Sequence, residues 1–122
     1  MRILVIEDNH DMRVCLRQML EDSRYKVYTV ANGKDALVFL ENNLLPDLIV
    51  LDVNMPIMNG EEFLIRLRGS VKFCAIPTLI VSGDLDGDLQ LANAFLVKPI
   101  EVHSFMSEVG LCLRGSPSFN HP

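Results

Sequence analysis

The sequence predicts an α/β domain in which helices cover both faces of a parallel β-sheet. Short β-branched apolar segments alternate along the chain with segments of helical periodicity, a pattern typical of βα units whose strands pair in parallel. Residues 48–51, Leu-Ile-Val-Leu, are apolar at every position, as is expected of a strand buried on both faces. Both observations point to the same class.

Five strands are expected in this sheet, each a short apolar segment bounded by turn-forming residues. They lie at residues 3–6, 26–30, 48–51, 78–81 and 95–97.

Amphipathic helices are expected where apolar residues recur every three or four positions. The first follows Asn9 or Asp11, either of which is a suitable N-cap. The second begins near Gly33, the third around residues 59–60, and the last follows Pro99. The side chains expected to face the core are Met12, Cys15, Leu16, Met19 and Leu20 in the first helix, and Val102, Phe105, Met106 and Val109 in the last.

The composition indicates one folded domain and argues against several classes of protein. With 122 residues, 49% hydrophobic and 22% charged, the chain can bury a core without disulfides or structural metals. Its net charge of −5 argues against direct binding to nucleic acid, which requires a basic surface. The first expected strand begins too early to leave room for a signal peptide, and no apolar stretch approaches the ~20 residues of a membrane span. We therefore expect a cytoplasmic protein, with residues 115–122 as a flexible tail or the start of a linker.

The three cysteines are widely spaced at Cys15, Cys74 and Cys112. No Cys-X-X-Cys or Cys/His spacing occurs, which argues against a zinc site and against a disulfide framework. Each lies among apolar residues, so each is predicted to be a reduced thiol in the core.

Polar and ionisable residues follow the expected strands at the point where each strand ends. Glu7 and Asp8 follow the first strand, Asp52 the third, Ser82 the fourth and Lys98 the fifth. Right-handed connections bring the carboxyl ends of parallel strands to one edge of the sheet, where ligands of α/β proteins bind. Any one of these residues could be a helix cap or a solvated surface group. Three carboxylates, a hydroxyl and an amine at one edge predict a functional site.

A cation is expected among the three carboxylates, because gathering them without one raises their pKa values and reduces stability. Asp8 and Asp52 are the best direct ligands, and Glu7 could act through a water molecule. Mg²⁺ takes oxygen ligands of this kind, with Mn²⁺ as an alternative. Zinc is disfavoured because neither His nor Cys joins the set.

This inventory suits phosphoryl transfer to a carboxylate. Asp52 is already ionised and could act as a nucleophile that forms an aspartyl phosphate. The metal, the Lys98 ammonium and a hydroxyl or backbone N–H near Ser82 would then neutralise the phosphate oxygens.

Four segments resemble the receiver domains of two-component response regulators, including the single-domain chemotaxis type. They are ILVIEDN at 3–9, LIVLDVNMPIMNGEEFL at 48–64, TLIVSG at 78–83 and FLVKPI at 95–100. All four in this order form a highly specific signal over essentially residues 1–113. The resemblance implies a flavodoxin-like doubly wound sheet of five parallel strands in the order 2-1-3-4-5, in a receiver domain spanning residues 1–114.

The resemblance also implies a role for each site residue. Asp52 would accept a phosphoryl group from a histidine kinase or a histidine phosphotransfer protein. Ser82 and Lys98 would bind the phosphate, with a cis peptide between Lys98 and Pro99. Ser82 and Phe95 would switch together and signal to a downstream protein, to an effector domain outside this sequence, or to a second copy in a homodimer. The implied Mg²⁺ ligands are Glu7, Asp8, Asp52 and the backbone carbonyl of Asn54.

One departure from the family pattern lies between the fourth and fifth strands. Only 16 positions separate Ser82 from Lys98, fewer than is usual in the family, which leaves little more than two turns for a fourth helix. Residues 83–88 are acidic and interrupted by glycine, so that helix is expected to be short or irregular. This could be a harmless shortening, or it could alter the surface that passes the signal on.

Other functions fit less well than a signalling phospho-acceptor that catalyses its own phosphorylation and dephosphorylation. An aspartate-nucleophile phosphatase carries its Asp-X-Asp motif after its first strand, whereas residues 52–54 here follow the third. A degenerate receiver that serves only as a binding module would lack part of the acid, hydroxyl and lysine set. A flavin carrier needs donors for its phosphate after the first strand, where Asp8 makes the loop acidic.

Overall fold

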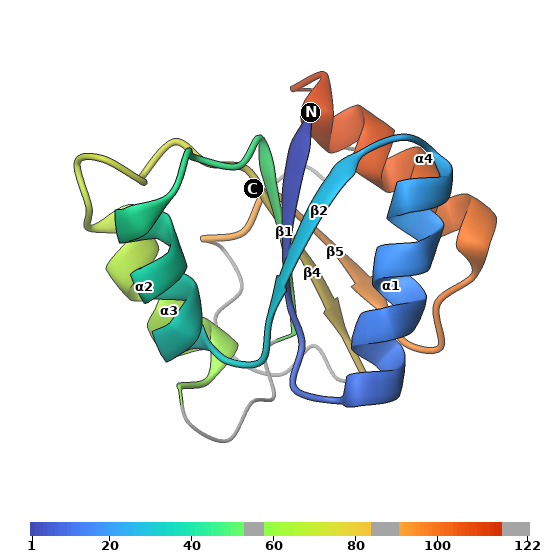
Figure 1. The fold of residues 1–122 in the computed structure, drawn as a ribbon, viewed down its shortest axis with the longest axis horizontal. Helices are drawn as coiled ribbons and strands as arrows, with labels where there is room; N and C mark the ends of the chain where they lie inside the picture. Colours follow the sequence, from blue (N-terminus) through green and yellow to red (C-terminus); the bar gives the residue numbers. More distant parts are fainter. Residues whose placement is uncertain (53–57, 84–90, 116–122) are drawn as a thin grey trace.

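The computed structural model describes residues 1–52, 58–83 and 91–115. These residues form a five-stranded parallel sheet with the strand order β2-β1-β3-β4-β5, which confirms the predicted topology (Figure 1). The strands are β1 (Arg2–Ile6), β2 (Lys26–Val30), β3 (Leu48–Leu51), β4 (Thr78–Ser82) and β5 (Ala94–Val97). They match the predicted strands except that β1, β4 and β5 are each longer by one residue.

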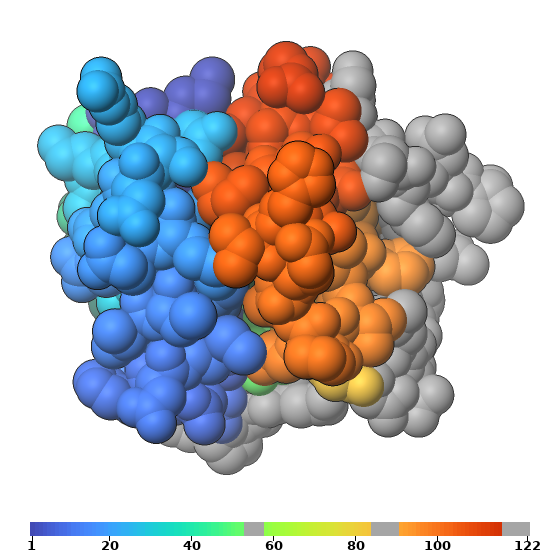
Figure 2. Space-filling model, turned by 90° about the vertical axis from the view of Figure 1, so that its right-hand side faces the viewer, coloured from blue at the N-terminus to red at the C-terminus, as the bar shows by residue number. Residues whose placement is uncertain are grey.

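Helices cover both faces of the sheet, as predicted. They are α1 (His10–Asp22), α2 (Gly33–Asn42), α3 (Gly60–Arg68) and α4 (Val102–Leu113). In Figure 1, α2 and α3 lie on one side of the sheet and α1 and α4 on the other. Figure 2 shows α1 and α4 side by side on their face of the molecule.

The short or irregular helix expected between the fourth and fifth strands falls mainly on residues 84–90, which lie outside the described residues. Gly83 and residues 91–93 are not helical.

Two apolar clusters hold the sheet to its helices. Alternate strand residues point to opposite faces, so Leu4 and Ile6 of β1 pack towards α2 and α3, while Ile3 and Val5 pack towards α1 and α4. All four residues of β3 are buried, which agrees with its continuously apolar sequence.

Asparagine side chains begin three of the helices at the same edge of the sheet. Asn9, Asn32 and Asn59 each accept a hydrogen bond at 2.8 Å from the backbone N–H three residues later. Such a bond satisfies one of the free N–H groups of a helix N-terminus. Of the two caps predicted for the first helix, Asn9 is the one used.

Two of the three cysteines are exposed, so the prediction of a core thiol is wrong for Cys15 and Cys74. Cys15 lies beside the buried stripe of α1 that Leu16 and Leu20 form, and not within it. Cys112 is buried as predicted, and desolvation, with a smaller effect of Glu108, raises the pKa of its thiol to about 12.

Val102 also departs from its predicted burial. It is the first residue of α4 and is 56% exposed, because the first turn of this helix extends beyond the core cluster that Phe105 and Val109 join.

The longest helix in the described part of the chain, α1, has 13 residues. None of the described helices combines the length and the apolar character that crossing a membrane requires.

Arg68 links the end of α3 to the two segments that lead into β4 and β5. Its guanidinium donates to the carbonyl oxygens of Cys74 at 3.1 Å and Ile76 at 2.7 Å, in the segment that leads to β4. It also donates to the Leu91 carbonyl at 2.9 Å and to Asn93 Oδ1 at 3.0 Å, just before β5. Burial lowers the pKa of this guanidinium, and its hydrogen bonds offset the loss of hydration.

Substitution Arg68→Ala should therefore destabilise the fold. It removes the donor to the part-buried Ile76 carbonyl and Asn93 Oδ1 and to two more exposed carbonyls, and we expect the free energy of unfolding to fall by about 2–4 kcal/mol. Urea unfolding would measure this. Arg66→Ala is the matched control, because Arg66 forms an exposed ion pair with Glu62 at 3.6 Å and its loss should change stability by less than about 0.5 kcal/mol. Equal effects of the two substitutions would contradict a structural role for the Arg68 contacts.

Candidate functional site

The acids of the site are placed by the pairing of the two central strands. Ile6 at the end of β1 lies beside Leu51 at the end of β3. Glu7 and Asp52 follow them directly, and the Asp52 N–H donates to the Ile6 carbonyl at 3.0 Å. The two carboxylates therefore leave neighbouring strands at the same level of the sheet.

Glu7, Asp8 and Asp52 form a cluster in which one carboxylate oxygen from each lies within 4.8 Å of the others. Glu7 is 1% exposed and Asp52 is 7% exposed, whereas Asp8 is open to solvent. Three oxygen donors with one open side suit a hard divalent cation that keeps several water ligands, such as Mg²⁺. The fourth predicted ligand, the backbone carbonyl of Asn54, lies outside the described residues.

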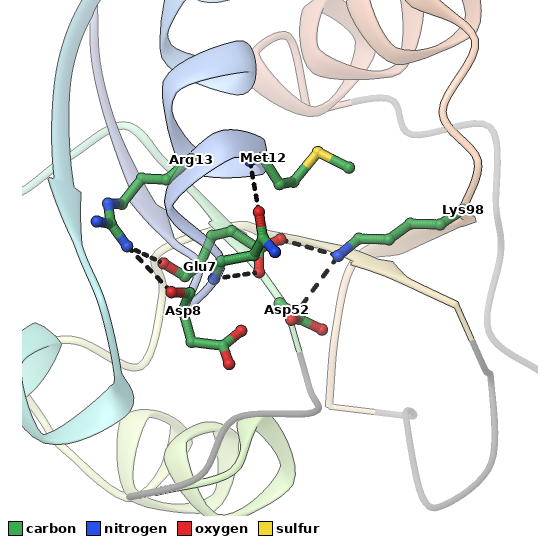
Figure 3. Close-up of polar contacts among 7 residues, drawn as sticks. Glu7, Asp8, Met12, Arg13, Asp52 and Lys98 are labelled. Carbon is green, nitrogen blue, oxygen red and sulfur yellow. Dashed lines mark hydrogen bonds and ion pairs between the residues drawn. The ribbon is translucent and has the colours of Figure 1, made fainter.

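Lys98 reaches this cluster from the end of β5 (Figure 3). Its Nζ lies 2.9 Å from Glu7 Oε1 and 3.8 Å from Asp52 Oδ2. The peptide bond between Lys98 and Pro99 is cis, as the family resemblance implied. In this arrangement, Lys98 bonds more closely to Glu7 than to the predicted phospho-acceptor.

The Glu7 carboxyl is strongly perturbed by its surroundings. Its pKa is raised to about 7, chiefly because burial penalises the charged form. The ion pair with Lys98 lowers the pKa, while a hydrogen bond to Asp52 and the charge of Asp52 raise it further. Two adjacent buried carboxyls with a single ammonium do not readily both stay ionised.

Ser82 and Phe95 lie on one face of the sheet. Ser82 is fully buried at the end of β4 and pairs with Val97, while Phe95 pairs with Ile80. Because side chains alternate along a strand, Ser82 and Phe95 point to the same side. Phe95 is half-buried and packs against the apolar cluster under α2 and α3.

The structure thus places all of the predicted site residues that it describes at or near one edge of the sheet. It adds Arg13 of α1, which the sequence analysis did not single out. Arg13 is half-buried, and its guanidinium donates to the Glu7 and Asp8 carbonyls. Every residue has a backbone carbonyl, so no pattern of residue types could have shown this contact.

Comparison with known families supports the resemblance to response regulator receiver domains. The model of the response regulator receiver domain matches residues 3–109. Among curated relatives, protein PilH of Pseudomonas aeruginosa is 29% identical over 93% of this chain and 98% of its own length. The transcriptional regulatory protein PrrA of Mycobacterium tuberculosis is 32% identical over 93% of this chain.

The relatives differ in how much of their own length this chain spans. The chain covers 50% of PrrA and 12% of the sensor histidine kinase TmoS of Ectopseudomonas mendocina, to which it is 32% identical over 88% of its length. The same module is therefore found in proteins of very different size.

Solved structures share the fold closely. A putative response regulator from Chloroflexus aurantiacus has a TM-score of 0.86 at 27% identity, over 93% of this chain and 97% of that one. The receiver domain of a Pseudomonas aeruginosa sensor histidine kinase, solved with a magnesium ion in its active-site cleft, has a TM-score of 0.85 at 25% identity, again over 93% and 97%. Sequence motifs, strand order, site geometry and relatives agree: the chain belongs to the family of response regulator receiver domains.

Proposed function

We propose that this chain is a signalling switch that accepts a phosphoryl group on Asp52 in a Mg²⁺-dependent reaction. The observation that carries the proposal is the position of Asp52. Its carboxylate is nearly buried at the end of the central strand β3, within 4.8 Å of the other two acids and 3.8 Å from Lys98 Nζ. No general base is required, because an ionised carboxylate is already a nucleophile.

The reaction follows from this geometry. A carboxylate oxygen of Asp52 bonds to the phosphorus of a phosphohistidine donor as the P–N bond breaks, and the imidazole of the donor leaves with the electron pair. Lys98 then stands where it can exchange its bond to Glu7 for one to a phosphate oxygen. Ser82, at the end of the neighbouring strand, is proposed to bind a second phosphate oxygen.

Glu7, Asp8 and Asp52 are the side chains proposed to hold Mg²⁺, with the backbone of Asn54 completing the set. When bound, the ion would neutralise charge on the transferred phosphoryl group. A receiver structure at 26% identity, response regulator TrrA of Thermotoga maritima, was solved in complex with Mg²⁺ and beryllofluoride. Together with the magnesium-bound histidine kinase receiver, it favours Mg²⁺ as the ion and gives no support to Mn²⁺.

We further propose that phosphorylation biases the positions of Ser82 and Phe95. The half-buried ring of Phe95 lies on the same face of the sheet as Ser82. Movement of the Ser82 hydroxyl towards a phosphate would alter packing on that face, which is how a local charge change can shift a two-state element.

The proposed phosphodonor is a histidine kinase or a histidine phosphotransfer protein acting in the cytoplasm on a receiver of residues 1–114. Downstream, the signal would pass to a partner protein, to an effector domain in a longer chain, or to a second copy through dimerisation. Relatives that contain this module include a transcriptional regulatory protein and a sensor histidine kinase.

Phosphorylation at Asp52 can be tested with a small phosphodonor such as acetyl phosphate. Wild-type protein with Mg²⁺ should gain one phosphoryl group by intact mass spectrometry, and Asp52→Asn should gain none. Asp22→Asn is the matched control, because Asp22 is an exposed carboxylate at the end of α1, and its labelling should equal that of wild type. Chelation of Mg²⁺ should abolish labelling. Undiminished labelling of Asp52→Asn would refute the proposal, and steady turnover of phosphomonoesters would indicate a phosphatase instead.

The raised pKa of Glu7 predicts a pH dependence of stability in protein without metal. The folded state holds a proton on Glu7 more tightly than the unfolded state does, so the free energy of unfolding falls as pH rises from about 4.5 through about 7. The decrease should be on the order of 1–3 kcal/mol. Urea unfolding with chelator between about pH 5 and pH 8 would show this decrease in wild type, and Glu7→Gln should remove it.

The control for this experiment is Glu21→Gln, since Glu21 is an exposed acid that pairs with Arg17 at 3.3 Å. It should retain the wild-type pH dependence. Saturating Mg²⁺ should raise the free energy of unfolding of the wild-type protein at high pH, because a ligand that binds only the folded state stabilises that state. A Glu7→Gln protein with the same pH dependence as wild type would show that Glu7 does not carry the effect.

The proposed coupling of Ser82 to Phe95 can be followed by fluorescence, because the chain contains no tryptophan. Phe95→Trp introduces a single reporter, and beryllofluoride with Mg²⁺ should shift its emission. Adding Ser82→Ala to this variant should abolish the shift. Val14→Trp, exposed on α1 at 51%, serves as a reporter away from the site and should not respond. An equal emission shift in Phe95→Trp and in the variant that also carries Ser82→Ala would rule out the coupling.

A further inference from the structure

We propose that Arg13 is a positioning residue for the acidic cluster. Its guanidinium holds the turn between β1 and α1 in the conformation that presents the Glu7 and Asp8 carboxylates to a cation. This inference rests on the Mg²⁺ site proposed above and concerns a residue of α1 that contributes no ligand to it.

Arg13 satisfies three consecutive carbonyl oxygens of this turn. Its Nη1 donates to the Glu7 carbonyl at 2.8 Å and to the Asp8 carbonyl at 3.3 Å. Its backbone N–H donates to the Asn9 carbonyl at 2.9 Å. One residue thus sets the direction of every peptide carbonyl from Glu7 to Asn9.

The peptide unit between Asp8 and Asn9 shows why this direction matters. Its carbonyl oxygen accepts a hydrogen bond from Arg13. Its N–H lies in the same plane, points in the opposite direction and donates to Glu7 Oε2 at 3.3 Å. Because a peptide unit is planar, the bond to Arg13 turns the Asn9 N–H towards the Glu7 carboxylate. The other oxygen, Glu7 Oε1, accepts from Lys98 at 2.9 Å.

Two cations therefore hold the turn in different ways. In Figure 3, Arg13 and Lys98 lie on opposite sides of Glu7, with Arg13 directed at the main chain and Lys98 at the carboxylates. Among residues 1–52, 58–83 and 91–115, no ion pair within 4.0 Å joins Arg13 to a carboxylate. Its contribution is hydrogen-bond geometry, with the remaining Nη2 placed 3.2 Å from His10 Nδ1.

This geometry distinguishes Arg13 from a simple positive charge. The planar guanidinium directs several N–H groups at once in a fixed arrangement, which the single ammonium of lysine does not reproduce. Residues that orient metal ligands without binding the metal commonly change its affinity 10- to 100-fold when replaced. Arg13→Lys should therefore weaken Mg²⁺ binding although the charge is unchanged.

The experiment compares wild type, Arg13→Lys, Arg13→Met and Arg17→Lys as metal-free proteins of residues 1–122. Arg17 lies one turn further along α1, is exposed and pairs with Glu21, so Arg17→Lys is the matched control. Titration calorimetry gives the affinity for Mg²⁺, and amide NMR spectra without metal report the environment of the Asn9 N–H. Thermal unfolding identifies a temperature at which every variant is folded.

Both Arg13 variants should lose about 10-fold in Mg²⁺ affinity, and both should show a displaced Asn9 amide resonance before any metal is added. Arg17→Lys should match wild type in both measurements. Wild-type affinity in Arg13→Lys, or an Asn9 resonance unchanged by either substitution, would overturn the inference. A wild-type protein that does not bind Mg²⁺ would instead overturn the proposed metal site, while the Asn9 resonance would still report whether Arg13 orients the turn.

Discussion

Removing the Glu7 and Asp52 carboxylates from water is the constraint on which the arrangement of the site depends. Two neighbouring acids, 1% and 7% exposed, are unfavourable together unless a cation lies close to them. Lys98 supplies that cation from 91 positions away in the sequence. The parallel sheet makes this possible because β1, β3 and β5 all end at one edge. The fold therefore brings the charges together.

The same constraint relates the resting site to its proposed chemistry. With Lys98 closer to Glu7 than to Asp52, the ammonium is held near the acceptor without occupying it. A bound cation would compensate the negative charge of the carboxylates, and Lys98 could then bind an incoming phosphate. Arg13 complements this by acting on the backbone, so that side chains and main chain of the turn are held by different residues.

Sequence reasoning predicted the parallel sheet and the position of the acids because these follow from patterns of residue type, whereas the strand order was implied by the resemblance to receiver domains. The apolar run at 48–51 and the polar residues after each strand are visible in any reading of the chain. Contacts made to backbone carbonyls cannot be recognised in the sequence, since every residue type supplies the same carbonyl. That is why the contacts of Arg13 and Arg68 could be found only in the structure. Cys15 shows a related limit: a single helical position, about 100° around the axis, separates it from the buried stripe.

The Arg68 contacts have a consequence for how this chain tolerates change in length. Arg68 holds the Leu91 carbonyl and the Asn93 side chain against the end of α3, and Asn93 also bonds to Thr78 at the start of β4. These contacts anchor the entry to β5 to the end of α3 and to the start of β4. A segment grafted after Gly83 would join the sheet at a fixed point, with the register of β5 and the reach of Lys98 preserved. A longer connection at this point would leave the edge of the sheet that carries the acidic cluster in place.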